Sequence, residues 1–485
     1  MSPYLVLSLV LGYFAVLMGI SWLTSRNADT QAFFTANRKS PWFLVAFGMV
    51  GATLSGVTFI SVPGEVGNTA FSYLQFVFGN IAGYWLVAGI LLPLYYRLNL
   101  VSIYTFLDQR FGSSSYKTGS FFFLISKLVG AAFRLYLVAT VLQIAFFDAF
   151  NIPFSVTVVI TIALIWVYTF KGGIKTIVWT DTLQTFFLVS AVIFTIIAIT
   201  RSLNFDFSTL VSRINSEPTS KIFFWDWRTG NNFFKQFFAG MFTTIVMVGM
   251  DQDMMQKNLT CKNKKEAQKN MMVFSLSFLV AVFLFLCLGV LLYVFAHETG
   301  ISVPDNTDEL YPLIALNYLG LPVGIAFLLG ITAAAYSSAD SALTALTTSF
   351  SVDFLKINNL REEIKRQRIK KRVHVLFSVL LIVVILVFRA ISNESVVVAV
   401  FTVAGYTYGP ILGLFVFGIY SRKKIKDKWV PLIAITSPLI CYFISKYSEV
   451  LFHGYQFGFE LLILNGLITI LGLFLVSEKY VVKNE

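Results

Sequence analysis

The sequence predicts an all-α polytopic membrane protein with about thirteen transmembrane helices. Three observations support this fold class. Hydrophobic residues make up 57% of the chain and charged residues only 13%, a balance that soluble domains do not show. Apolar runs long enough to cross a bilayer recur along the whole chain, and basic residues are concentrated in alternate connections between them. We expect one membrane domain over 1–485, without an attached soluble domain.

The expected spans follow one another with short connections. About 20 mostly apolar residues cross the roughly 30 Å of hydrocarbon. The first run, from Tyr4 to Leu23, has no basic segment before it and no small-residue cleavage site after it, so we expect a retained helix. The ranges, in order, are 3–23, 41–62, 71–96, 118–147, 153–170, 176–200, 233–256, 271–296, 322–349, 373–392, 394–420, 430–447 and 457–476.

Alternate connections differ strongly in charge. Of the 37 Lys and Arg residues, 28 fall in the segments 24–40, 97–117, 171–175, 257–269, 350–372, 421–429 and 477–485. Basic connections mark the cytoplasmic side of a membrane protein. We therefore expect a protein of the cell (inner) membrane with its N-terminus outside and its C-terminus in the cytoplasm. The basic run 361–372 should then lie against anionic membrane lipid and not bind nucleic acid.

Span two carries glycines, Pro63 and polar residues where an unbroken helix is expected: 47-FGMVGATLSGVTFISVPGEVG-67. One interpretation is a kinked packing helix, because membrane helices tolerate Gly and Pro. The other is a broken helix whose freed carbonyl oxygens bind an ion or whose half-helix end meets a substrate. The polar character that span two shares with span nine favours the second interpretation.

Three further spans carry charged residues. Arg134 in span four is costly at bilayer depth, so it either pairs with Asp340 or Asp181 or binds a substrate carboxylate. Asp181 in span six either lies in the inner interface or, if buried, needs a cation, a proton or a donor partner. Asp251 and Asp253, at the end of span seven near the cytoplasmic mouth, fit a gate or an interface better than a catalytic pair.

Span nine, 327-FLLGITAAAYSSADSALTALTTSF-350, combines an apolar run with hydroxyl groups and one acid. Ala334, Ser337, Ser338 and Ser341 recur at i, i+3, i+4 and i+7, which places them on one helix face. The stripe fits either small-residue packing or an oxygen-lined site for a small hard cation. Asp340, on or beside the stripe, favours the cation site because a carboxylate within the membrane usually has a function.

Enzyme chemistry is not indicated. The three histidines lie at span ends, and neither HExxH nor GxSxG occurs in the chain. The three cysteines are scattered and suggest neither a disulfide framework nor a zinc site. We therefore expect no catalytic residues and no organic cofactor.

Four stretches of the sequence resemble segments of the sodium/solute symporter family. This family includes the sodium-coupled sugar, proline, sialic acid, iodide and monocarboxylate carriers. The segment 172-GGIKTIVWTDTLQ-184 resembles the family's GG-x-x-x-[VI]-x-W-T-D-x-x-Q pattern, and 250-MDQDMMQKNLTCKN-263 resembles its DQ-x-x-x-Q-[RK] turn. The stretch 53-TLSGVTFISVPGE-65 is similar to the first core helix of the sialic acid and iodide/vitamin branches. AAYSS, at 334–338, is similar to the family's sodium motif.

The resemblance implies a LeuT-type fold with two inverted repeats of five helices, at 41–200 and 233–420. One extra helix at 1–24 would precede the repeats, and two at 430–476 would follow them. It also implies a sodium-coupled symporter that imports a small organic solute by alternating access, with Na⁺ as the coupling ion and no obligate protein partner.

The same resemblance implies a sodium site between spans two and nine. Its ligands would be the carbonyl oxygens of Gly51, Leu54 and Ala334 and the hydroxyls of Ser337 and Ser338. Neutral oxygens suit a hard monovalent cation that must also be released. Some family members hold a second sodium, which here would use Asp181, Ser337 and Ser341. The chain departs from the family pattern by carrying Asp340 where a small hydroxyl is usual, so the occupant of a second site at Asp181, Asp340 and Ser341 is open between sodium, a proton and Arg134.

The solute site is expected at mid-membrane, beside the broken helices. The candidate residues are Ser55, Thr58, Gln75, Asn80 and Arg134. Arg134 and the first core helix slightly favour an anionic or carboxylate-bearing solute. A neutral sugar or amino acid is the alternative, as is a transporter-like channel or sensor on the same fold.

Overall fold

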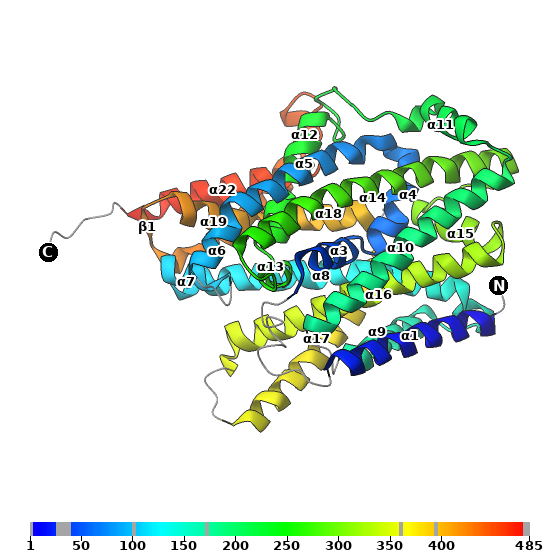
Figure 1. The fold of residues 1–485 in the computed structure, drawn as a ribbon. Coiled ribbons are helices and arrows are strands. Elements are labelled where there is room, and N and C mark those ends of the chain that lie inside the picture. Colours follow the sequence, from blue (N-terminus) through cyan, green and yellow to red (C-terminus); the bar gives the residue numbers. More distant parts are fainter. Residues whose placement is uncertain are drawn as a thin grey trace.

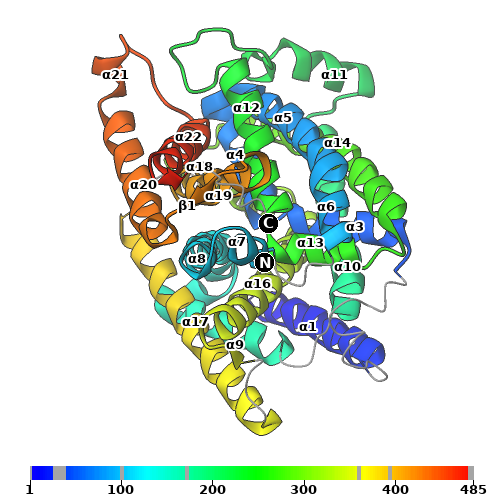
Figure 2. The same cartoon turned by 90° about the vertical axis from the view of Figure 1, so that its left-hand side faces the viewer.

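The computed structural model describes residues 3–25, 40–98, 103–169, 174–357, 362–391 and 396–478, without the side chains of some helical residues in these ranges. Almost all of this part of the chain is helical. Figure 1 shows the long helices running roughly alongside one another, and Figure 2 shows the same bundle from one end.

The described elements up to residue 202 are α-helices and short 3-10 or π turns. In order they are α1 (Pro3–Ser25), α3 (Trp42–Thr53), α4 (Gly56–Thr69), η2 (Ala70–Ser72), α5 (Tyr73–Leu86), η3 (Val87–Leu91), α6 (Leu92–Leu98), α7 (Thr105–Arg110), α8 (Ser113–Ala145), η4 (Phe147–Phe150), α9 (Phe154–Thr169) and α10 (Ile174–Ser202).

The elements after residue 202 are again helical, apart from one pair of two-residue strands. In order they are α11 (Phe207–Ser216), η5 (Pro218–Ser220), α12 (Phe233–Thr244), η6 (Ile245–Gly249), α13 (Gln252–Leu259), α14 (Lys264–Thr299), η7 (Thr307–Glu309), α15 (Leu310–Asn317), α16 (Leu321–Ser349), η8 (Phe350–Phe354), α17 (Glu363–Ile391), α18 (Val396–Thr407), α19 (Gly409–Tyr420), β1 (Lys424–Ile425), η10 (Asp427–Trp429), α20 (Val430–Lys446), α21 (Ser448–Leu451), α22 (Leu461–Leu475) and β2 (Ser477–Glu478).

Each predicted span coincides with one helix or with a series of consecutive helical segments. Within the described residues, six helices are long and apolar enough to cross a membrane, and α18 with α19, bent by 46°, makes a seventh. Shorter apolar helices account for the other ranges: Tyr4–Ile20, Trp42–Thr53, Phe154–Trp166, Phe233–Gly249, Leu321–Ala334 and Leu461–Leu475. The count of thirteen spans, and the division into two repeats, stay predictions.

The long helices differ in how deeply they lie in the bundle. In α14, 72% of the most apolar 18-residue window is buried, against 28% in α17 and 22% in α20. Helix α14 is therefore largely covered by other parts of the protein, whereas α17 and α20 expose most of their apolar surface, as expected for helices that face lipid. The Asn263 side chain accepts the Glu266 N–H at the start of α14, and Gly300, with φ of +69°, ends it.

Helix α4 is fixed by a cluster of aromatic rings. The ring of Phe59 lies 5.9 Å from that of Phe285 in α14, 5.2 Å from Tyr311 in α15 and 5.5 Å from Phe327 in α16, between centroids. All four rings are fully buried. Aromatic contacts of this kind add to the apolar burial, so α4 is held against three other helices while its first residues lead out of a break.

Candidate functional site

The break predicted in span two is present, between α3 and α4. Leu54 has φ −73° and ψ 73°, and Ser55 has φ −77° and ψ 176°, so neither residue is helical. The Ser55 N–H donates to the carbonyl of Thr53 at 2.9 Å, whereas in a continuous helix it would donate to Gly51. The break therefore removes the helical donor of the Gly51 carbonyl, one of the predicted sodium ligands.

Gly51 lies where α3 crosses α10. A β-carbon at this position would be 2.2 Å from Thr185 Oγ1 and 2.5 Å from the carbonyl oxygen of Asp181, far inside van der Waals contact. Only glycine allows this approach, and Thr185 Oγ1 also donates to the Asp181 carbonyl at 2.8 Å. The end of α3 and the WTD segment are thus packed directly together.

Helix α16 carries the hydroxyl stripe and packs along α10 and against α3 and α4. It is continuous through Ala334, Ser337, Ser338 and Ser341, so the four residues share a face as the spacing predicts. The side chains of Ser337, Ser338 and Asp340 lie outside the described part of the structure, and their ligand roles stay predictions. Ser341 is buried, and its hydroxyl has no hydrogen-bond partner within the described residues.

Asp181 has a cationic neighbour that the sequence did not predict. Its Oδ2 lies 3.2 Å from Nζ of Lys257, in α13, and the two side chains are only 1% and 3% exposed. The sequence left the partner of a buried Asp181 open between a cation, a proton and a donor, with Arg134 as the basic side chain considered. Beside it in α10, Gln184 is buried, with neither amide atom hydrogen-bonded within the described residues. The family turn ending in Lys257 was visible in the sequence, but its contact with span six was not.

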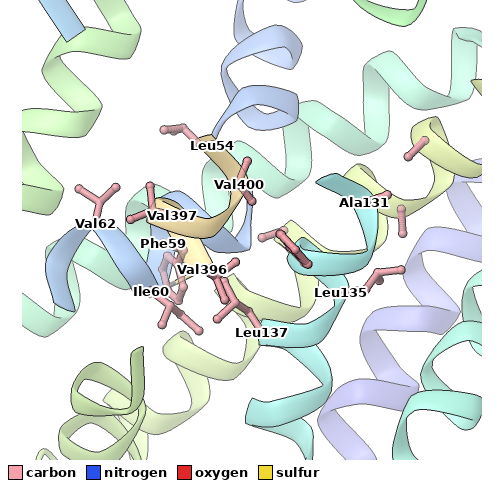
Figure 3. Packing of buried hydrophobic residues seen from close by; sticks show 14 of the residues in the cluster. Leu54, Phe59, Ile60, Val62, Ala131, Leu135, Leu137, Val396, Val397 and Val400 are labelled. Carbon is pink, nitrogen blue, oxygen red and sulfur yellow. The ribbon is translucent and has the colours of Figure 1, made fainter. Parts of the chain in front are cut away.

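Arg134, Ser55 and Thr58 lie around the break. Ser55 and Thr58 are buried, and Arg134 is half-buried in α8. A β-carbon on Gly56, the first residue of α4, would lie 3.4 Å from Ile331 Cδ1 and 3.8 Å from the carbonyl oxygen of Arg134. Figure 3 shows side chains of α4, α8 and α18 converging here, with Leu54 and Leu135 among those labelled. The break therefore packs against α8 and α16, and the solute-binding roles of Ser55, Thr58 and Arg134 stay predictions.

Gln75 does not face this region, and the structure gives it a different role. Its Nε2 donates to the Asn231 carbonyl at 2.9 Å, and its Oε1 accepts the Phe224 N–H at 3.1 Å. The side chain is fully buried and holds α5 to the connection before α12. Because backbone groups occupy its amide, we no longer consider Gln75 a solute ligand.

Asn80 is also engaged within the protein. With its amide nitrogen directed at α12, it donates to the Gly240 carbonyl at 2.9 Å and to Thr244 Oγ1 at 3.1 Å. Glycines allow α5 and α12 to approach closely, since a β-carbon on Gly79 would lie 1.9 Å from the Phe237 carbonyl oxygen. Asn80 thus joins two helices, and we remove it from the solute candidates as well.

A cavity of about 400 Å³ lies toward the predicted outer end of the bundle. It is lined by α4, α5, α12, α14, α18 and the connections before α12 and α22, with residues that include Glu65, Tyr73, Asn231, Gln236, Val397 and Phe459. Gln236 is buried, and its Oε1 has no hydrogen-bond partner within the described residues. The cavity is large enough for a small organic solute.

Comparison with known proteins places these features in one family. The model of the sodium:solute symporter family matches residues 33–427. The chain is 26% identical over 421 residues to the sodium/sialic acid symporter NanT of Aliivibrio fischeri, covering 85% of this chain and 82% of that protein. It is 24% identical over 442 residues to the human sodium/iodide cotransporter, covering 84% and 65%.

Solved structures show the same fold. A Na⁺-coupled sialic acid symporter, described as substrate-bound and outward-open, superposes with a TM-score of 0.81 at 20% identity, over 98% of both chains. Mhp1, in an inward-facing conformation, superposes with a TM-score of 0.54 at 15% identity, over 90% of both chains. The LeuT-type fold predicted from the sequence is confirmed. The protein is a multi-pass integral membrane protein of a transporter family, and the chain belongs to the sodium:solute symporter family.

Proposed function

We propose that this protein imports a small organic solute carrying a carboxylate, together with sodium, by alternating access. The observation that carries the choice of solute is Arg134, whose backbone lies against the start of α4 beside the break. An arginine within a membrane span usually faces a partner or a water-filled cavity. Its guanidinium can form two parallel hydrogen bonds with a carboxylate, which selects charge and shape together.

The names of the relatives support an anionic solute. The proteins compared above are named for sialic acid and iodide, and another relative at 24% identity is the human sodium-coupled monocarboxylate transporter 1. All of these solutes are anions at neutral pH. Ser55 and Thr58, at the start of α4, would donate hydroxyl hydrogen bonds to the polar remainder of the solute.

We propose that the coupling sodium binds between α3 and α16, to the carbonyls of Gly51, Leu54 and Ala334 and the hydroxyls of Ser337 and Ser338. The loss of the helical donor to Gly51 supports this, because an unwound carbonyl within a membrane needs another partner. The packing of α16 against α3 supports it further. Asp181, Asp340 and Ser341 remain the candidates for a second cation site, now with Lys257 beside Asp181.

The cycle follows from these positions. Sodium bound at the break would hold α3 and α4 in the geometry that the solute needs, so solute binds to the sodium-loaded, outward-open state. Loading of both favours closure and inward opening, and low internal sodium then releases the ion. With the N-terminus outside, the membrane potential contributes about 2.3 kcal/mol per net positive charge carried inward per 100 mV.

The test begins with a binding screen. Purified protein is heated with sugars, carboxylic acids, amino acids and vitamins, with and without sodium, and a sodium-dependent rise in melting temperature identifies the solute. Uptake is then measured in proteoliposomes for the wild type and Arg134→Gln. We expect Arg134→Gln to weaken binding of an acid by about 10- to 100-fold, since hydrogen bonds to charged groups contribute about 1.5–3 kcal/mol.

Arg213→Gln is the matched control, because Arg213 lies in α11 with its side chain 38% exposed and pairs with Glu217 and Glu298. It should leave uptake unchanged. A screen in which only neutral compounds bind would remove the carboxylate from the proposal and leave the neutral-solute alternative. Counterflow separates a carrier from a channel or sensor, since only a carrier exchanges labelled internal solute for external solute.

A further inference from the structure

The second break in the bundle lies in span seven and is held by side chains from the first half of the chain. Helix α12 runs into the π turn η6, Met250 leaves the helix with φ −114° and ψ 14°, and α13 begins at Gln252. Gly249 ends η6, and Met250 and Asp251 are not helical, so these three residues form the break. Irregular backbone at this depth needs partners from elsewhere in the protein.

Two tyrosines hold the carbonyl groups of this break. The Tyr95 hydroxyl, from α6, donates to the Gly249 carbonyl at 2.6 Å. The Tyr104 hydroxyl, at the start of α7, donates to the Met250 carbonyl at 3.0 Å. Both tyrosines are buried, so the hydrogen bonds are protected from water. The bonded residues are 154 and 146 positions apart in the sequence.

The third contact is an ion pair at the next residue. Nζ of Lys127, in α8, lies 2.8 Å from Oδ2 of Asp251, and the side chains are 12% and 3% exposed. The other oxygen of Asp251 accepts the Met254 N–H at 3.3 Å, in the first turn of α13. Asp251 therefore caps α13 and binds α8 at once. Three consecutive residues of the break are each tied to a different element of the first half.

The position of these contacts relates them to the proposed solute site. Lys127, Ala131 and Arg134 recur at i, i+4 and i+7 on one face of α8, so Lys127 lies about 10 Å from Arg134 along the helix, on the predicted cytoplasmic side. Figure 2 views the bundle from that end, where α6, α7, α8 and α13 lie around the middle of the view. The 400 Å³ cavity lies toward the other end.

We propose that Lys127, Asp251, Tyr95 and Tyr104 form the inner gate of the transporter. The three contacts join the two halves of the bundle between Arg134 and the predicted cytoplasmic face, and they must separate before solute and sodium can leave on that side. This proposal rests on the transport function proposed above, but it specifies where the inward path is closed and by which atoms. The four are positioning residues: they act on the conformation and need not touch the solute.

The test measures the opening of this path without using any solute. In full-length protein with Cys261, Cys287 and Cys441 replaced by serine, Ala131→Cys reports on the face of α8 between Lys127 and Arg134, where Ala131 is buried. A membrane-impermeant maleimide is applied to either side of the membrane in sodium-free buffer, in right-side-out and inside-out vesicles.

Loss of the ion pair in Asp251→Asn or Lys127→Met should raise labelling from the cytoplasmic side about tenfold, which corresponds to about 1.4 kcal/mol in the conformational equilibrium. Tyr104→Phe removes one hydrogen bond and should raise labelling about fivefold, the effect of a typical single hydrogen bond. Tyr311→Phe is the control, since the Tyr311 hydroxyl lies 2.9 Å from Thr195 Oγ1, away from the break.

A single variant that leaves one charge buried can fail to fold. The double variant Lys127→Met/Asp251→Asn removes both charges, so it avoids an unpaired buried charge. Its rate of labelling from the cytoplasmic side then tests the gate. Labelling at the wild-type rate in the double variant and in Tyr104→Phe overturns the gate, even if sodium still raises the melting temperature. Absence of any sodium effect on the wild type would instead count against the proposed function, so the two failures are distinguishable.

Discussion

The Asp181–Lys257 pair shows what a buried charge requires of its neighbours. Both side chains are almost completely removed from solvent, in a region where an isolated carboxylate would be strongly disfavoured. The ammonium of Lys257 offsets that cost and joins α13 to α10. The pair also lies next to the crossing at Gly51, since the backbone of Asp181 is what a β-carbon there would meet. Charge balance at this point is therefore coupled to the geometry of the proposed sodium site.

Lys257→Met should destabilise the protein strongly, because it removes the ammonium that lies 3.2 Å from the buried Asp181 carboxylate. Breaking a buried ion pair by removing one partner costs about 3–5 kcal/mol, whereas neutralising both partners is much less harmful. Thermal unfolding in detergent should show a large loss for Lys257→Met and partial recovery for Asp181→Asn/Lys257→Met. Equal melting temperatures for the wild type and Lys257→Met would show that the pair does not matter for stability.

Ser337→Ala or Ser338→Ala should raise the sodium concentration that gives half-maximal uptake by about tenfold, because each removes one oxygen ligand from the proposed site. Maximal uptake at saturating sodium should change less. Ser378→Ala is the matched control, since the Ser378 hydroxyl bonds only to the His374 carbonyl one turn earlier among the contacts described. Sodium dependence that stays the same in both variants would contradict the assignment.

Single residues were predictable from the sequence only where the chain itself carries the signal. Glycines and polar residues within an apolar run indicate a break, and the break at Leu54 and Ser55 is present. Gln75 and Asn80 looked equally polar, but each also bonds groups more than 140 positions away, which no local pattern reveals. For the same reason Tyr95, Tyr104 and Lys257 could not be recognised before the fold was known.

At the scale of elements, the two broken spans are fixed in different ways. Helix α4 is held mainly by apolar and aromatic contacts, with one hydrogen bond from the Tyr293 hydroxyl to the Gly64 carbonyl at 2.6 Å. The break before α13 is held by two hydroxyls and a charge. Apolar packing is non-directional, but hydrogen bonds and ion pairs depend on geometry and break over short distances. The polar contacts before α13 therefore suit a connection that opens and closes.

A further connection between elements involves Asp308, in the turn between α14 and α15. Its Oδ2 accepts the N–H of Val396 at 2.9 Å, which caps α18, and the neighbouring Thr307 carbonyl packs on Gly64 of α4. Burial raises the pKa of Asp308 from 3.8 to about 6, against the opposing effect of the Val396 N–H, and Glu309 raises it further. The carboxyl thus binds its proton more tightly in the folded protein than in the unfolded chain.

This pKa predicts how stability depends on pH. Because the pKa of Asp308 is higher in the folded protein, binding of its proton stabilises the fold. This stabilisation is fully present below about pH 4 and is lost as the pH rises through about 6. The free energy of unfolding changes by about 3 kcal/mol over this range. Asp308→Asn remains neutral and keeps an acceptor for Val396, so it should raise the melting temperature at pH 7.5 and change it little at pH 4.5. An equal change at both pH values would contradict the prediction.

At the scale of the whole molecule, the cavity and the proposed inner gate lie at opposite ends of the bundle. The cavity at the predicted outer end is bounded by α4 and α18, and the contacts at residues 249–251 close the route on the other side. Hydropathy and loop charge were enough to predict the helices and their order. They do not show which end is closed, because that depends on side chains brought together from different spans.

The number of cations per cycle is the last property that belongs to the whole molecule, and the membrane potential can reveal it. One sodium carried with a monovalent acid moves no net charge, whereas a second cation at Asp181, Asp340 and Ser341 makes the cycle move one positive charge inward. We expect wild-type uptake to respond to potential, since about 2.3 kcal/mol per 100 mV corresponds to roughly 50-fold greater accumulation.

Asp340→Asn should lower the cation-to-solute ratio and abolish that response while sodium dependence remains. Uptake measured in proteoliposomes with a potassium diffusion potential, at fixed sodium and solute gradients, checks both. If wild-type accumulation is the same at zero and at −100 mV, a single cation accompanies the acid and the second site has no part in coupling.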